Sequence, residues 1–312
     1  MKIPGSSRLV HLSATIGGLL LLMATTSPAQ DDLTFGANPW TWNGSVSATV
    51  GQVSFTHWAA GGEFSYLLGL NSTISPQWSD SLWSFVGSWY GKYSVFKRKS
   101  EPARKVDDDL ELSVKFGRML FPSFHAVVFA DLQSQFWPGY DFYMSSTAYT
   151  SNFMAPGYLT NGLGLDYRTN DQVLSIILSP FSSKETIVLD RGVDPTQYGV
   201  DKGKHVFGAP GAYSKITVNG KIIGSLSGNF RAILFKDYTR RVSPDLSFKG
   251  QLDYQLLSFL QLYFRLDLLN DDDINVNLYE DLDNDGSADD FAGVGPRLQV
   301  STQLGVALTV SF

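Results

Sequence analysis

The 312-residue sequence has no cysteine and only four histidines, and beyond its N-terminus it has no run of about 18 apolar residues. Without cysteine, the chain can form no disulfide framework, no thiolate zinc site and no lipid-anchored N-terminal cysteine. The missing apolar runs exclude a membrane-spanning helix in the rest of the chain. Charged residues make up 17% of the sequence and the formal net charge is −6, which argues against nucleic acid as a partner.

The first 29 residues have the features of a cleaved signal peptide. Lys2 and Arg8 make the start positive, residues 16–23 (IGGLLLLM) form a short apolar core, and small residues at 27–29 precede a cleavage site. The apolar core is too short to be a transmembrane anchor. We therefore expect residues 1–29 to be a signal peptide and residues 30–312 to form one exported domain.

Strict alternation of apolar and polar residues is the strongest pattern in the mature chain. In the last segment the apolar set is Leu298, Val300, Leu304, Val306, Leu308, Val310 and Phe312, with mainly polar or small residues between them. A period of two places the two sets on opposite faces of a strand. Similar runs occur at 108–120, 245–256 and 259–270, and each lasts about 9–11 residues or more, the length with which a tilted strand crosses a bilayer.

Twelve strands are predicted in all, joined by connections of two kinds. The predicted strands are 44–56, 62–75, 81–96, 108–120, 123–137, 157–168, 172–181, 212–220, 222–236, 245–256, 259–270 and 297–312. Short turns are predicted at 77–80, 121–122, 169–171, 219–220 and 257–258, and longer polar connections at 57–62, 97–107, 138–156, 182–211, 237–244 and 271–296. Short and long connections alternate throughout. This asymmetry predicts an all-β fold, a closed antiparallel transmembrane barrel of about twelve strands with short periplasmic turns and long external loops.

Alternation by itself also fits a soluble barrel, whose apolar face would point inward. The polar faces carry charges that suit a wet or salt-bridged lumen: Glu111, Lys115, Asp131, Arg231, Lys249, Asp253, Arg265 and Asp267. The terminal Phe312, with apolar residues at every second position before it, resembles the C-terminal signature of bacterial outer-membrane barrels. We therefore expect a barrel in contact with outer-membrane lipid, with both termini in the periplasm and a narrow lumen.

Six stretches carry a family resemblance, and the order of the fourth and fifth is its most specific part. The stretches are 55–63 (FTHWAAGGE), 90–92 (YGK), 105–108 (KVDD), 151–158 (SNFMAPGY), 162–167 (GLGLDY) and 178–180 (LSP). Together they resemble a Bacteroidota outer-membrane barrel family known as domain of unknown function 3078. The resemblance implies a barrel and an outer-membrane location. It implies no activity and no catalytic residues.

The sharpest local motif is an acidic stretch with the spacing of a calcium loop. Its candidate ligands are Asp281, Asp283, Asp285, Ser287 and Asp289, around the glycine at 286. Alternate oxygens folded around a sharp glycine turn suit a hard cation such as Ca²⁺. Position 12 is Ala292, so the bidentate glutamate of an EF-hand is missing, and an acidic solvated loop is the alternative. The run 271–273 (DDD) could add a second site, although a solvated run is the simpler interpretation.

Catalytic motifs are weak. The sequence has no G-x-S-x-G and no H-E-x-x-H. His57 lies beside Trp58 in a glycine-containing loop that we interpret as a tight hairpin rather than a ligand contact. His125 is predicted to face the barrel interior, and His205 lies in a long loop. We expect no enzyme. The leading hypothesis is an outer-membrane barrel that passes or binds small solutes; the alternatives are a non-conducting barrel that displays calcium-ordered loops to a surface partner, and a membrane hydrolase.

Overall fold

The computed structural model describes residues 40–53, 65–99, 102–140, 149–280 and 290–311. The predicted signal peptide, His57, Trp58 and all five candidate calcium ligands lie outside these residues. Among the described residues, no helix is long and apolar enough to cross a membrane. All the strands belong to one unit, residues 39–312.

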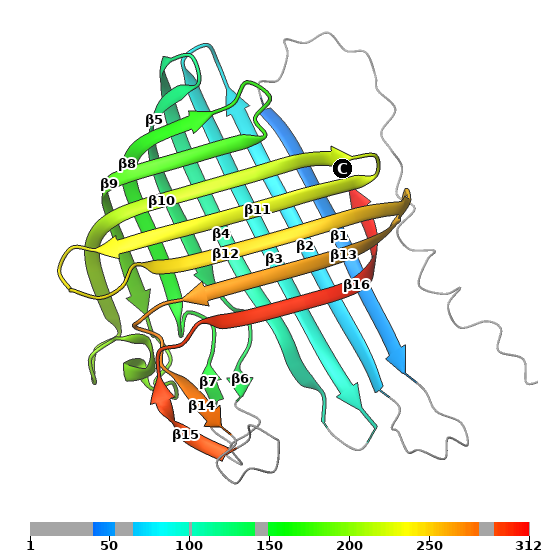
Figure 1. The fold of residues 1–312 in the computed structure, drawn as a ribbon, viewed down its shortest axis with the longest axis vertical. Helices are drawn as coiled ribbons and strands as arrows, with labels where there is room; N and C mark the ends of the chain where they lie inside the picture. Colours follow the sequence, from blue (N-terminus) through cyan, green and yellow to red (C-terminus); the bar gives the residue numbers. More distant parts are fainter. Residues whose placement is uncertain (1–39, 54–64, 100–101, 141–148, 281–289, 312) are drawn as a thin grey trace, which may run out of the picture. The chain divides into compact units, whose positions relative to one another are not determined.

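Twelve antiparallel strands form one closed barrel (Figure 1). Its strands are β1 (Trp40–Val53), β2 (Ser65–Ser79), β3 (Trp83–Arg98), β4 (Arg104–Phe121), β5 (Phe124–Ser134), β8 (Gly157–Arg168), β9 (Leu174–Ile187), β10 (Val206–Ile223), β11 (Leu226–Asp237), β12 (Asp245–Leu257), β13 (Leu260–Asn270) and β16 (Gln299–Ser311). Each pairs with its sequence neighbours in the barrel, and β1 pairs with β16 to close the ring. The predicted fold class and strand count are confirmed.

Short and long connections lie at opposite ends of the barrel strands. The short-turn end holds the links β2–β3, β4–β5, β8–β9, β10–β11 and β12–β13, together with the start of β1 and the end of β16. The long connections lie at the other end, the loop end, which faces the left and lower sides in Figure 1. Asp80 shows how a short turn is made, because its carboxylate accepts hydrogen bonds from the backbone N–H groups of Leu82 and Trp83 at 2.7 and 2.6 Å.

Two predicted boundaries were wrong. Asn219 and Gly220 form no turn, because they lie within β10 opposite Asn229 and Gly228, and the chain reverses at Gly224 with a φ of 55°. The predicted loop 182–211 is shorter than expected, since β9 continues to Ile187 and β10 begins at Val206. The alternation that marks the rest of the strands fades there, because residues 182–186 of β9 are polar on both faces and residues 206–211 of β10 include two glycines and a proline.

The two faces of the strands differ in the way that the sequence predicts. Outward-facing apolar side chains are exposed; Leu304 of β16 is 81% exposed and Val114 of β4 is 49% exposed. Inward-facing charged side chains are buried, among them Glu111, Asp131 and Arg265 at 6%, 7% and 5% exposure. A soluble barrel would bury the first set and expose the second.

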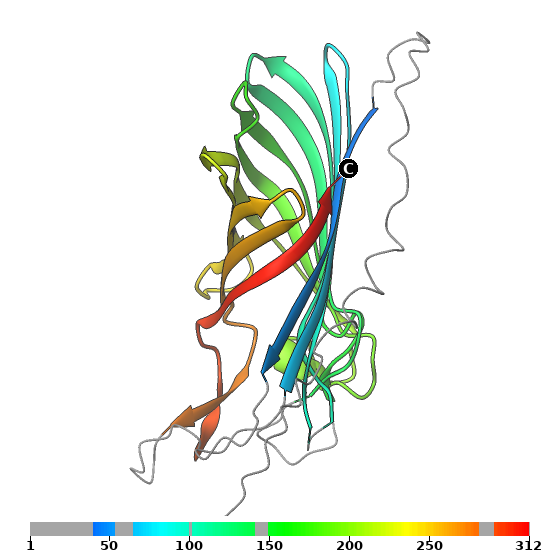
Figure 2. The ribbon, with the colours of Figure 1, turned by 90° about the vertical axis from the view of Figure 1, so that its right-hand side faces the viewer.

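The long connections contain ordered structure that the sequence patterns did not reveal. Two small hairpins lie in them, β6 (Gly139–Tyr140) with β7 (Tyr149–Ser151) and β14 (Val276–Glu280) with β15 (Asp290–Gly295). A 3₁₀ turn, η1 (Pro195–Tyr198), lies between β9 and β10. Buried Ala155, Val188, Val193 and Val200 form a small apolar core that joins two of these connections. Figure 2 shows these loop segments together below the barrel.

Candidate functional site in the barrel lumen

Strand β4 lines the lumen with a row of charged side chains. From the loop end toward the short-turn end, Asp107, Asp109, Glu111 and Lys115 occupy every second position except that of Ser113, because successive inward residues of a strand are two apart. Each meets a partner of opposite charge from another strand. Asp107 pairs with Lys92 of β3, Asp109 pairs with Arg265 of β13 at 2.9 Å, and Lys115 pairs with Asp166 of β8 at 2.6 Å.

Glu111 holds the central position of this row. Its carboxylate accepts hydrogen bonds from Arg231 of β11 and from Lys249 of β12, each at 2.5 Å. Five strands separate β4 from β12 in either direction around the barrel. Glu111 and Lys249 therefore join opposite walls of the barrel directly across the lumen. We call Glu111, Arg231 and Lys249 the crossbar.

The crossbar lies between cavities in the lumen. On its loop side is a cavity of about 860 Å³, which we call the vestibule; Tyr198 and Gln197 of the loops line it together with Glu111 and Lys249. A cavity of about 280 Å³ also has Glu111 and Lys249 in its wall, together with Arg231. A third, of about 320 Å³, extends toward the short-turn end. Side chains thus divide the lumen into compartments.

A second polar cluster fills the lumen near the short-turn end. The carboxylate of Asp166, which is fully buried, accepts hydrogen bonds from Lys115, Arg168 and Ser175 at 2.6, 2.6 and 2.7 Å. His125 lies directly opposite Asp166 in the β5–β8 ladder and shares its face. The prediction that His125 points inward is confirmed. His205 lies in a loop, where its Nδ1 is 2.9 Å from the carbonyl oxygen of Val188.

One side of the lumen is packed with apolar and aromatic side chains. Val127, Phe129, Ile177, Tyr213 and Phe235 form a buried cluster. The rings of Phe129 and Tyr213 are stacked with centroids 4.8 Å apart. The Tyr213 hydroxyl donates to Asp131 at 2.7 Å, and Lys215 reaches the same carboxylate at 3.0 Å. This packing narrows the lumen between β5 and β10.

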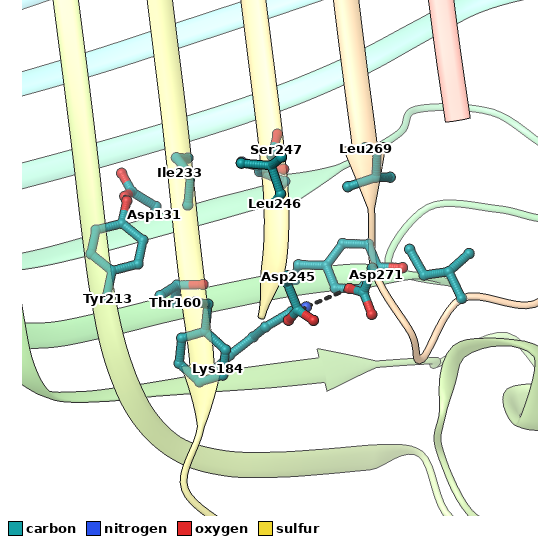
Figure 3. A pocket seen from close by; sticks show the side chains of 14 residues that line it. Asp131, Thr160, Lys184, Tyr213, Ile233, Asp245, Leu246, Ser247, Leu269 and Asp271 are labelled. Carbon is teal, nitrogen blue, oxygen red and sulfur yellow. Dashed lines mark hydrogen bonds and ion pairs between the residues drawn. The ribbon is translucent and has the colours of Figure 1, made fainter. Parts of the chain in front are cut away.

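Next to the vestibule is a pocket of about 100 Å³, shown in Figure 3. Lys184 of β9 lies between Asp245, at the start of β12, and Asp271, which follows β13; its ammonium is 2.7 and 2.6 Å from their carboxylates. The Lys184 ammonium also lies 5.4 Å from the centroid of the Tyr158 ring, a cation–π geometry. We call these four residues and the cavity beside them the side pocket.

Two of the three carboxylates in the acidic run that follows β13 are paired with cations. Asp271 pairs with Lys184, and Asp273 forms two hydrogen bonds to the Arg240 guanidinium at 2.6 and 2.5 Å. Asp272 accepts a hydrogen bond from the backbone N–H of Ser243 at 2.9 Å. The interpretation of 271–273 as a solvated run is therefore wrong for Asp271 and Asp273, which form ion pairs. Among the residues that the structure describes, no group of His, Asp or Glu could hold a metal ion.

The loops at the loop end of the vestibule carry two titratable groups with shifted pKa values. Burial raises the pKa of Tyr198 to about 12, and its hydroxyl donates to the carbonyl oxygen of Thr150 at 3.1 Å. Hydrogen bonds from the side chain and backbone of Thr196 hold the pKa of Asp194 below its ordinary value. Asp194 is the residue that caps η1.

Sequence reasoning found part of this site. The eight predicted inward charges include the whole crossbar, Asp131 and Arg265. It missed Asp107 and Asp109, although the period of two continues from Glu111 back through both positions. It also missed Lys184 and Asp271, which were assigned to loops. Lys184 is separated in sequence from its partners Asp245 and Asp271 by 61 and 87 residues, and no local pattern predicts such pairings.

Comparison with known proteins adds a partial family match and distant structures. The family model described as a protein of unknown function (DUF3078) matches residues 50–140. No curated protein matches the sequence. Similar solved structures include the COG4313 outer membrane channel from Pseudomonas putida F1, at 8% identity and a TM-score of 0.39 over 92% of this chain and 100% of that one.

Two further structures have the same order of similarity. The translocator domain of the autotransporter NalP from Neisseria meningitidis is 11% identical, with a TM-score of 0.31 over 89% of this chain and 91% of that chain. OmpT, an outer membrane protein of Vibrio cholerae, is 7% identical, with a TM-score of 0.32 over 88% and 97%. None of these similarities assigns an activity to this chain.

Proposed function

We propose that this protein is an outer-membrane barrel that binds small polar solutes in its vestibule and passes them when the crossbar opens. The single observation that carries this proposal is the crossbar itself. Contacts between the side chains of Glu111, Arg231 and Lys249 separate the vestibule from the cavities on the short-turn side. Side chains change rotamer far more readily than a β-ladder breaks, so such a barrier can open while the barrel stays intact.

The membrane location rests on the exposed apolar face. Leucine, valine and phenylalanine side chains cover the outside of the barrel, and their exposure to water would be unfavourable by roughly 25 cal/mol per Å² of apolar surface. Lipid removes this cost, and closure of the barrel pairs the strand edges that hydrocarbon would leave unsatisfied. We place the short-turn end in the periplasm and the loop end outside, following the usual asymmetry of such barrels.

Single-channel recording in planar bilayers tests the proposal. The wild-type protein should open rarely, and the variant Glu111→Ser/Arg231→Ser/Lys249→Ser should conduct several-fold more. A matched control is Asp201→Asn/Lys204→Gln, which removes an exposed loop pair and should conduct like wild type. If neither the wild type nor the triple variant conducts, the barrel is closed and the non-conducting alternative is favoured. Resistance of the folded band to SDS confirms that each variant has folded.

The calcium loop remains a separate proposal. The strands on either side of residues 281–289 pair as β14 and β15, with Glu280 opposite Asp290, so the ends of the candidate loop are held together. A preformed hairpin lowers the entropy that a cation must overcome to order the loop. Removal of Ca²⁺ by a chelator should speed proteolytic cleavage within 281–289. Cleavage at an unchanged rate would argue for a plain acidic loop.

A further inference from the structure

We propose that the side pocket binds the ammonium group and the short apolar chain of a small organic cation. The proposal rests on the proposed function, because the solute reaches this pocket through the vestibule. It adds the chemical class of the solute: a primary alkylamine in its protonated form, rather than a neutral or anionic compound. Three observations carry it, namely an excess of negative charge, an apolar wall and continuity with the vestibule.

The charge around the pocket is unbalanced. The Lys184 ammonium is shared between the carboxylates of Asp245 and Asp271, and the three side chains are only 14%, 16% and 3% exposed. Asp131, the other acidic residue of the wall, is already neutralised by Lys215. One buried negative charge is therefore left over. An uncompensated buried charge is costly, and a bound cation removes that cost.

A second group of ion pairs joins the β11–β12 connection to the segment that follows β13. Arg240 is bound to Asp237 and Asp273, so this group also carries one more carboxylate than cation. Asp272 adds another carboxylate, which accepts only a backbone N–H group among the described residues. Lys236, at the end of β11, donates to the carbonyl oxygen of Val242 in the same connection. The charge excess that attracts a cation is therefore that of the pocket itself, two carboxylates around the single ammonium of Lys184.

The other walls of the pocket are apolar or aromatic. Ile233, Phe235, Ile274 and the rings of Tyr158 and Tyr213 line a space of about 100 Å³, enough for a short alkyl chain or a small ring. The Tyr158 ring already holds the Lys184 ammonium over its face. The described residues offer no hydrogen-bond acceptor to the Tyr158 hydroxyl, which borders both cavities. Aromatic faces and free oxygens beside carboxylates are the groups that bind ammonium ions.

The pocket opens on the route that a solute would take. Five residues line both the vestibule and the side pocket: Gln133, Tyr158, Ser247, Leu269 and Ile274. A solute in the vestibule can therefore place one end in the side pocket and keep a polar remainder in the larger space. In Figure 3 the Lys184 side chain reaches from one wall toward Asp245 and Asp271, with Tyr213 and Ile233 on the other side of the space.

Calorimetric titration of the full-length barrel, folded in detergent, tests this inference with three probes of similar size. n-Butylammonium should bind saturably, 1-butanol at least about tenfold more weakly, and butyrate not measurably, because only the first neutralises the excess carboxylate. Equal affinities for butylammonium and butanol would overturn the inference. This result is independent of conductance: a barrel that conducts but does not prefer the ammonium would keep the proposed function and lose the ligand class.

Two variants locate the site and guard against misfolding. Asp245→Asn should weaken butylammonium binding about tenfold, since it removes the charge excess. Ile233→Trp keeps every charge and fills the apolar space, so it should weaken binding as well. Asp201→Asn changes an exposed side chain that does not line the pocket, and it should bind like wild type. Resistance to SDS shows which variants have folded, and unchanged binding in both folded pocket variants would refute the site.

Discussion

The two faces of the same barrel strands have opposite chemistry and opposite exposure. On β4, Val114 points outward and is 49% exposed, whereas Glu111 points inward and is 6% exposed. The two residues are only three positions apart. Val114 is an exposed apolar side chain, whereas Glu111 forms ion pairs with Arg231 and Lys249. The comparison shows that the outer face exposes apolar side chains, whereas the lumen is filled by paired charges.

We expect the largest loss of stability from a charged substitution on the outer face of the barrel. Val114→Arg places a charge near the middle of β4 on the lipid side, where it should lower the free energy of unfolding by about 2–4 kcal/mol. Denaturant titration of the protein in lipid vesicles measures this. Val114→Leu is the control and should change stability little. If the two variants were equally stable in vesicles, the outer face would not be in hydrocarbon.

We expect a smaller loss of stability when an ion pair on the inner face is removed. Glu111→Gln leaves Arg231 and Lys249 without their shared carboxylate. Removal of one member of a buried pair costs about 3–5 kcal/mol, but these cations are 21% and 23% exposed, so we expect about 1–3 kcal/mol. The double variant Glu111→Gln/Arg231→Gln should recover part of the loss in the same titration. A double variant less stable than either single variant would contradict the crossbar.

The smallest effect concerns the loops, which belong to neither face. Hydrogen bonds from Thr196 lower the pKa of Asp194 from an ordinary value of 3.8, so its contribution to loop stability is present above that pH. The contribution should be lost as the pH falls below 3.8 through the lower folded-state pKa. Hydrogen exchange of the backbone amides of residues 196–199 as a function of pH measures this. Asp194→Ala should flatten the profile, and an unchanged profile would show that the cap contributes nothing.

Sequence reasoning succeeded for features that depend on neighbouring residues in the chain. The period of two shows which residues share a face, so it predicted twelve strands and the inward position of Glu111, Lys115 and Arg265. It failed at the end of β9, where both faces are polar, and at the start of β10, where glycines and a proline interrupt the pattern. The Asn-Gly pair at 219–220 is a strong turn signal, but pairing with Asn229 and Gly228 prevailed over it.

The site was harder to predict than the fold. Lys184 and Asp271 were assigned to loops, and their pairing joins residues 87 positions apart. Asp272 and Asp273 were interpreted as a solvated run or a metal site, whereas a backbone N–H group and Arg240 hold them. A charged residue's partner depends on which strands face each other in the closed barrel, and composition carries no information about that.

By itself, the sequence determined the strands, their two faces and the alternation of short and long connections, because side-chain direction in a strand repeats locally every two residues. Only the tertiary structure decided how the ring closes. Five residue pairs, Ser45–Thr49 with Ala307–Ser311, join β1 to β16 across the whole length of the chain. That closure places β4 opposite β12 and so brings Glu111 to Lys249, 138 residues away. The crossbar and the side pocket exist because long-range pairing sets which inward charges meet.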